Sequence, residues 1–158
     1  MLKKRKYFIS LLLISGLIIF TGCSINKNVK TDETEEFTKS ILESNEKVKE
    51  LNFYFRRPSL HSDLIHDGDL DEEEFEDLID EFKTLIDIEF MEKIGEKYWK
   101  GIRPSGFNIY IHIDEINDYD YLLESHYRKY RNQPDGPDNI DGYQTYIIFD
   151  PHISPEPK

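Results

Sequence analysis

The sequence predicts an α+β fold, in which a small, mainly antiparallel sheet of at least three strands carries an amphipathic helix or helix pair on one face. Two segments alternate apolar with polar residues, which is the period of half-buried strands. A third segment, residues 71–100, repeats apolar residues every three or four positions, which is the period of a helix with one buried face. A sheet and a helix of this kind each need the other to bury their apolar faces.

Strands are predicted at three places. In residues 51–56, the apolar side chains alternate with polar ones until Pro58 ends the segment. Residues 107–114 have the clearest alternation, with Phe and Ile on one face and Asn, Tyr, His and Asp on the other. Residues 143–149 alternate less regularly and are the third predicted strand.

Residues 71–100 form the main predicted helical segment. Asp69 or Asp71 can cap its start, and the acidic residues that follow suit the positive end of a helix dipole. Gly95 weakens the helical pattern, and Ile88 lies off the apolar stripe, so we expect either one long bent helix or two helices that meet near Asp87. Gly101 then offers a left-handed stop. The apolar stripe consists of Phe75, Leu78, Ile79, Phe82, Leu85 and Ile86.

Weaker helical spacing predicts two further helices, at residues 37–47 and 119–131. Residues 132–142 are rich in Asp, Pro and Gly and are predicted to be a loop.

Near the N-terminus, four basic residues at positions 3–6 are followed by an apolar run over residues 7–20 and then by Thr21-Gly22-Cys23. A basic start, a short apolar run and small residues before the cut are typical of a secretory signal peptide. The run is too short for a spanning helix, which needs about 20 apolar residues. An ordinary secreted protein with a free cysteine is the other alternative.

Ending on the chain's one cysteine, this segment resembles the lipobox of bacterial lipoproteins. The resemblance implies that the thiol of Cys23 carries a diacylglyceryl group and that the mature protein begins there, tied to the cell membrane on its extracytoplasmic side. Two acyl chains satisfy the two-signal requirement for stable anchoring. The resemblance covers the leader alone. The expected organisation is a signal peptide in residues 1–22, a lipidated Cys and flexible tether in 23–36, a single domain in 37–150 and an extended or disordered tail in 151–158.

Charge narrows the range of partners. The chain has 32 acidic and 20 basic residues, a formal net charge of −12, and it becomes more acidic once the basic leader is removed. Because nucleic acids and anionic headgroups bind through Lys and Arg, both partners are disfavoured. The same charge favours a cationic peptide or divalent ions, although solubility alone also explains it.

Metal and catalytic motifs are weak. The acidic run 67–74 starts like a calcium loop, but Glu72 and Leu78 stand where the motif needs Gly and Glu. The spacing of His61 and His66 does not place both rings on one helix face, so we expect no metal. No nucleophile elbow, phosphate-binding loop or zinc-protease motif is present in the sequence, and no cofactor is expected.

The polar faces of the predicted strands supply the candidate binding residues. If the strands are neighbours, an aromatic and hydrogen-bonding strip forms opposite the helices, and Tyr is enriched where proteins bind. Cross-strand pairing is the structural alternative. The candidate residues are Tyr54, Tyr110, His112, Asp114 and Tyr146, with Arg56 beside them.

Three hypotheses follow. The first is a membrane-anchored, non-catalytic module that binds a protein, peptide or envelope component through the tyrosine-bearing face. The second is an envelope-acting enzyme, with His112 and Asp114 on one strand face as the residues to test. The third is an immunity-type lipoprotein that captures a cationic peptide.

Overall fold

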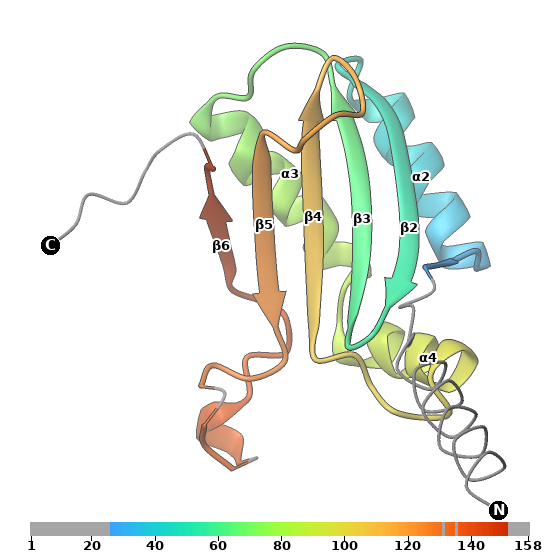
Figure 1. Ribbon diagram of the computed structural model, residues 1–158, viewed down its shortest axis with the longest axis vertical. Coiled ribbons are helices and arrows are strands. Elements are labelled where there is room, and N and C mark those ends of the chain that lie inside the picture. Colours follow the sequence, from blue (N-terminus) through green and yellow to red (C-terminus); the bar gives the residue numbers. More distant parts are fainter. Residues whose placement is uncertain (1–25, 131, 135, 152–158) are drawn as a thin grey trace, which may run out of the picture.

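The structure is a computed structural model that describes residues 26–130, 132–134 and 136–151. In this part of the chain, six strands form one sheet in the order β1-β2-β3-β4-β5-β6 (Figure 1). The predicted α+β fold, with a mainly antiparallel sheet, is confirmed. The strands are β1 Lys27–Asn28, β2 Val48–Arg56, β3 Ser59–His66, β4 Gly106–Ile113, β5 Tyr121–His126 and β6 Tyr146–Phe149. The helices are α2 Asp32–Ser44, α3 Glu72–Leu85, α4 Ile88–Tyr98 and the short 3₁₀ helix η1 Pro137–Asn139.

Neighbouring strands are antiparallel except β3 and β4, which are parallel. A parallel pair needs a long crossover connection. Here α3 and α4 supply it, and they lie with α2 on the same side of the sheet (Figure 1). The chain therefore builds a two-layer structure in which the helices cover one sheet face.

The predicted helix pair is confirmed, with its junction at Asp87. Asp71 caps α3 by accepting a hydrogen bond from the Glu74 N–H at 2.9 Å. Asp87 caps α4 in the same way, accepting from the Phe90 N–H at 2.7 Å. Gly101, with a φ of 81°, ends the segment in the left-handed conformation. Two capping carboxylates therefore divide one apolar stripe into two helices.

Phe82 is the centre of the contact between helices and sheet. Its side chain is fully buried, and its ring lies 5.5 Å from Phe107 of β4 and 5.2 Å from Phe37 of α2. Ile111 of β4 is also fully buried. These contacts confirm that the apolar stripe of α3 packs on the Phe/Ile face of the sheet.

The helix predicted for residues 119–131 is wrong, because residues 121–126 form β5. Strand β5 pairs with β4 on one side and with β6 on the other. The hydrogen bonds of these two pairings override the local helical spacing. The sequence pattern does not predict strand β3, because its His, Ser and Asp residues are typical of a loop. In the structure, β3 is a central strand of the sheet.

The predicted bounds at the N-terminal side also need correction. The tether predicted for residues 23–36 contains β1, and α2 begins at Asp32 rather than near 37. Thr31 and Thr34 form a reciprocal cap there, which the sequence reading missed. The leader and Cys23 lie outside the described residues. Within the described part, no helix is both long and apolar enough to cross a membrane.

Candidate functional site

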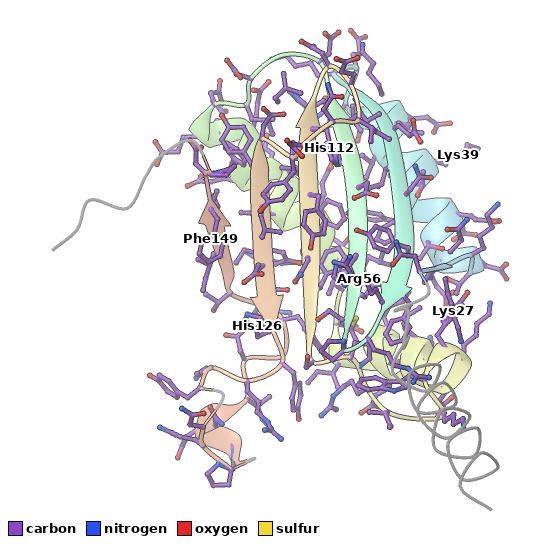
Figure 2. The ribbon with its side chains drawn as sticks, in the orientation of Figure 1. Lys27, Lys39, Arg56, His112, His126 and Phe149 are labelled. Atoms are coloured by element: carbon purple, nitrogen blue, oxygen red, sulfur yellow. The ribbon has the colours of Figure 1, made fainter. Side chains whose placement is uncertain are left out.

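The sheet has one face that the helices do not cover. Successive residues of a strand point to opposite faces, so the pairing register assigns each side chain. Leu60 and Leu64 of β3 pair with Phe107 and Ile111 of β4, and these four residues form the helix-covered face. The residues that alternate with this set, His61 and Asp63 of β3 and Asn108 and Tyr110 of β4, form the other face, which looks toward the viewer in Figure 2. Within the described residues no helix packs on this uncovered face (Figure 1).

An aromatic row crosses the uncovered face from β2 to the β4–β5 connection. The ring of His61 stacks between Tyr54 and Tyr110, with centroid distances of 5.1 Å and 5.8 Å and nearly parallel planes. Tyr110 then meets Tyr119 edge-on at 5.2 Å. We call these four side chains, Tyr54, His61, Tyr110 and Tyr119, the aromatic row. The three tyrosines are partly accessible, whereas His61 is only 4% exposed.

Apolar side chains extend this face toward the edge strand β6. Tyr110 pairs with Leu122 of β5, and Leu122 pairs with Phe149 of β6. Ile147 lies on the same face, two residues before Phe149. Ile147 and Phe149 are 48% and 46% exposed. Large apolar side chains that stay accessible beside an aromatic row form the kind of surface that protein partners cover.

His61 is held as a neutral ring at the centre of the row. Its Nε2 lies 3.2 Å from the Arg56 carbonyl oxygen, which fixes the ring's orientation. Burial lowers the pKa of His61 to about 4, and the nearby Arg56 side chain adds to this effect. The imidazole therefore acts at neutral pH as an uncharged aromatic ring between two tyrosines.

Beside the row, Asp63 connects Tyr54 with His112. The Tyr54 hydroxyl donates to Asp63 Oδ1 at 3.4 Å, and His112 Nε2 lies 3.8 Å from the same oxygen. Burial raises the pKa of Asp63, and His112 partly opposes this shift. Burial likewise raises the pKa of Tyr54. The 3.8 Å separation is too long for a hydrogen bond. The neighbouring hydroxyl of Ser62 points to the helix-covered face, so it cannot serve as a nucleophile beside them.

The structure brings together three of the predicted site residues, Tyr54, Tyr110 and His112, on the uncovered face. Asp114 does not join them. It follows the end of β4 with a φ of 65° and accepts a hydrogen bond from the Gly68 N–H at 3.1 Å. The acidic neighbour of His112 is instead Asp63, so the expectation that His112 and Asp114 share one strand face is wrong.

Tyr146 is a second correction. It pairs with Ser125, which in turn pairs with Phe107, and this register places Tyr146 on the helix-covered face. Its hydroxyl is buried, and burial raises its pKa. The predicted strand 143–149 starts three residues too early, and its irregular alternation hid the orientation of its side chains.

The sequence reading missed Asp63 as the partner of His112, and it missed Tyr119, Leu122 and Phe149 as members of the face. The available signal was the alternation of Leu60 and Leu64 with polar residues in β3. The idea of a shared metal site for His61 and His66 fails, because they point to opposite faces of β3. Among the described residues, no group of three or more His, Cys, Asp and Glu side chains could hold a metal ion.

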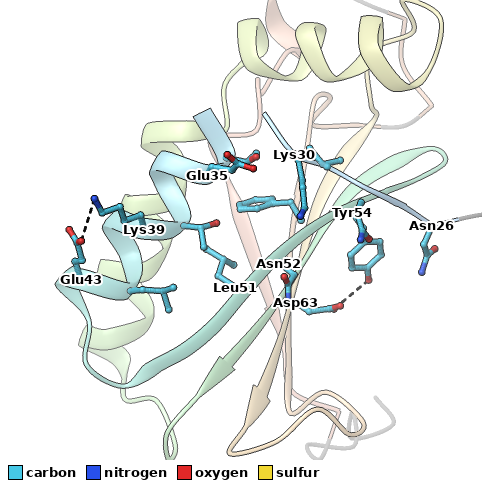
Figure 3. Close-up of a pocket in the computed structure, with 15 residues that line it drawn as sticks. Asn26, Lys30, Glu35, Lys39, Glu43, Leu51, Asn52, Tyr54 and Asp63 are labelled. Carbon is cyan, nitrogen blue, oxygen red and sulfur yellow. Dashed lines mark hydrogen bonds and ion pairs between the residues drawn. The ribbon is translucent and has the colours of Figure 1, made fainter. Parts of the chain in front are cut away.

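A groove of about 840 Å³ lies next to the row, between α2 and the edge of β2 (Figure 3). Its walls come from β1, α2 and β2, and Tyr54 and Asp63 close one end. Lys39 and Glu43 of α2 form an ion pair at 3.7 Å along its rim. The groove joins the uncovered face at Tyr54, so it can extend the contact surface of a partner.

Comparison with protein-family models, curated proteins and solved structures finds no match for this chain.

Proposed function

We propose that this protein is a membrane-anchored, extracytoplasmic lipoprotein whose domain is a non-catalytic binding module for a protein or peptide partner. The partner binds the uncovered sheet face through the aromatic row and the apolar side chains next to it. The N-terminal motif ending in Cys23 supports the anchor. The proposal depends most on one observation, the partly accessible stack of Tyr54, His61 and Tyr110 opposite the helices.

Rigid aromatic side chains are suited to this task. Tyrosines lose little conformational freedom on binding, and aromatic anchors on rigid elements contribute most of the energy of many interfaces. On this face, stacking with His61 already restricts the rings of Tyr54 and Tyr110 before a partner arrives. The central strands beneath them are hydrogen-bonded on both sides, which keeps the surface rigid.

Capture of a cationic peptide is a second candidate, and a specific observation favours it. Residues 67–74 and 114–120 contain ten acidic residues and no Lys or Arg, and they are joined by the Gly68–Asp114 hydrogen bond. Such a local field steers a positively charged partner toward the adjoining face. Binding that weakens steeply with salt would identify this class of partner.

A photo-crosslinking experiment tests the binding face. A photoreactive amino acid at Leu122 of the full chain, expressed in native membranes, should give a discrete cross-linked product. Tyr110→Ser should reduce that product at least tenfold while leaving the melting temperature nearly unchanged, because the ring is partly accessible and anchors the partner.

Tyr130→Ser is the matched control, because Tyr130 is 58% exposed and lies outside the face. It should leave the cross-linked product intact. Equal products from Tyr110→Ser and Tyr130→Ser would contradict the proposal. A Tyr110→Ser variant that unfolds would show that the row is structural.

A further inference from the structure

Acidic residues gather at one end of the sheet. Strands β3 and β4 end there, at the paired residues His66 and Ile113. The segments that follow are the acidic segments described above, residues 67–74, which include the first turn of α3, and residues 114–120. The Asp114 N–H donates to the His66 carbonyl oxygen at 2.8 Å. We call this the acidic end. In Figure 1 it is the upper end of the sheet.

The opposite end of the sheet is basic, and four segments that are distant in sequence meet there. The Lys30 N–H donates to the Tyr98 hydroxyl at 3.2 Å, and Lys97 Nζ donates to the Lys30 carbonyl at 2.9 Å. The Ser105 N–H donates to the Pro58 carbonyl, and the Tyr127 N–H to the Ser105 carbonyl. Residues 26–30, 56–59, 97–103 and 126–130 contain no Asp or Glu. Their basic residues are Lys27, Lys30, Arg56, Arg57, Lys97, Lys100, Arg103, Arg128 and Lys129.

Neighbouring acids only partly offset this basic end. Glu92 of α4 pairs with Arg103 at 2.9 Å, and Glu89 pairs with Lys93 at 3.2 Å. The carboxylate of Asp141 accepts from the Gln144 and Thr145 N–H groups and so stabilises its own loop. Glu96 and Asp138 are also nearby, as are Glu124, which lies 3.7 Å from His126, and Asp32 and Glu33 at the start of α2, where Glu33 lies 3.5 Å from Lys93. The excess of positive charge at this end is therefore small, and it comes from the four segments that contain no Asp or Glu.

Apolar and aromatic groups are accessible among the basic residues. Ile102 is 52% exposed, and the half-buried Trp99 lies next to it, with the Arg57 guanidinium 5.9 Å from its ring. A cavity of about 820 Å³ opens between Trp99, Arg103, Tyr127 and Arg128. The Arg103 guanidinium stacks on the Tyr127 ring at 3.5 Å. Trp and Tyr beside Lys and Arg are typical of surfaces at a membrane–water interface.

We propose that this basic end docks onto an anionic lipid surface. The chain enters the described domain beside it, because residues 26–30 lead directly to the contact with Tyr98 and Lys97. An N-terminal membrane anchor would therefore hold this end, rather than the acidic end, against the bilayer. The domain then stands on its basic end, with the strands roughly upright and the uncovered sheet face exposed sideways to a partner.

The overall negative charge does not prevent this docking. Eight residues of β3 or β4 separate the two ends, which corresponds to about 26 Å at about 3.3 Å per residue. The Debye length at physiological ionic strength is about 8 Å, so the acidic end is screened from lipid headgroups that touch the basic end. The net charge of the chain disfavours headgroup binding, but it does not show that the acidic and basic residues lie at opposite ends of the sheet.

Trp99 is the single tryptophan of the chain, so its fluorescence reports on this end alone. The full chain is reconstituted through its N-terminal segment into vesicles of phosphatidylcholine, with or without phosphatidylglycerol. Both vesicle types contain lipids that carry a nitroxide quencher near the headgroup. Trp99 should be quenched strongly only when phosphatidylglycerol is present. Raising the salt to 1 M, where the Debye length is about 3 Å, should abolish that difference.

The double variant Lys100→Gln/Lys129→Gln should lower the docked-to-undocked ratio about fivefold for each lysine removed. Lys39→Gln/Lys49→Gln removes the same charge away from the basic end and should leave quenching unchanged. Equal quenching in both vesicle types, or an equal loss in both double variants, would overturn the proposal. The comparison of vesicles and salt uses the wild-type chain, so it stands even if a variant folds poorly.

Discussion

At the scale of single residues, the uncovered face shows how a histidine can serve as an aromatic spacer. His61 is nearly inaccessible, and its Nδ1 has no hydrogen-bond partner among the described residues. A charged imidazole would be costly there, which agrees with a pKa lowered to about 4. The ring therefore stays neutral and lets Tyr54 and Tyr110 stack on either side.

This lowered pKa predicts a pH dependence of stability. The unfolded chain binds a proton at His61 below its ordinary pKa of about 6.5, whereas the folded chain binds it only below about 4. The free energy of unfolding should therefore fall as the pH drops from about 6.5 to 4, by up to about 3 kcal/mol from this residue. His61→Phe keeps an aromatic spacer and removes the titration.

Urea unfolding of both proteins near pH 7 and near pH 4 measures the effect. Near pH 7 the variant should be about 1 kcal/mol less stable, because it loses the hydrogen bond to the Arg56 carbonyl. Near pH 4 it should equal or exceed the wild type. Stability curves that run parallel over this range would show that His61 is not buried as a neutral ring.

The role of Gly95 in packing could not be predicted from the sequence. The sequence pattern predicts only that Gly95 weakens the helix, whereas a Cβ at this position would lie 2.8 Å from the Ile102 carbonyl carbon and 3.0 Å from Arg103 Cα. The segment after α4 therefore packs directly against the helix backbone. This close approach positions Ile102 and Arg103 at the basic end, and no local pattern predicts it.

At the scale of elements, local chemistry decided what could be predicted. The helix pair was predictable because its apolar stripe and the caps Asp71 and Asp87 all lie close together in sequence. Strand β3 was not, because its place in the sheet comes from pairing with β2 and β4. The same reason explains β5. Only part of the site was therefore predictable, namely Tyr54, Tyr110 and His112 on strands with clean alternation.

The packing of α3 on the sheet gives a stability prediction. Phe82→Ala should lower the free energy of unfolding by about 3–5 kcal/mol, because the ring is fully buried against Phe37, Phe53 and Phe107. Chemical denaturation measures the change. Leu42→Ala is the control, since Leu42 is 39% exposed on α2, and it should change stability by about 0.5 kcal/mol or less. Similar losses in the two variants would mean that Phe82 is not central to the core.

At the scale of the whole molecule, composition predicted an acidic protein but not where its charges lie. The fold brings the ten acidic residues of two segments, 67–74 and 114–120, together at one end. The Lys and Arg residues of four separate segments meet at the other end through hydrogen bonds between distant residues. Net charge is a sum, so it carries no information on this separation. A chain that excludes anionic partners on average can still bind them at one end.

The proposed anchor and the proposed docking of the basic end would contribute differently to membrane attachment, and Cys23→Ser can separate the two contributions. Electrostatic docking contributes about 1 kcal/mol for each basic residue near the surface and weakens with salt. Two acyl chains contribute about 0.8 kcal/mol for each buried methylene and do not depend on salt. In fractionated cells, the wild type should therefore stay with membranes through a high-salt wash. Cys23→Ser, once its signal is removed, should be released by the same wash. If the wild type keeps its leader and the variant stays quantitatively bound, residues 7–20 hold the membrane as an uncleaved signal anchor.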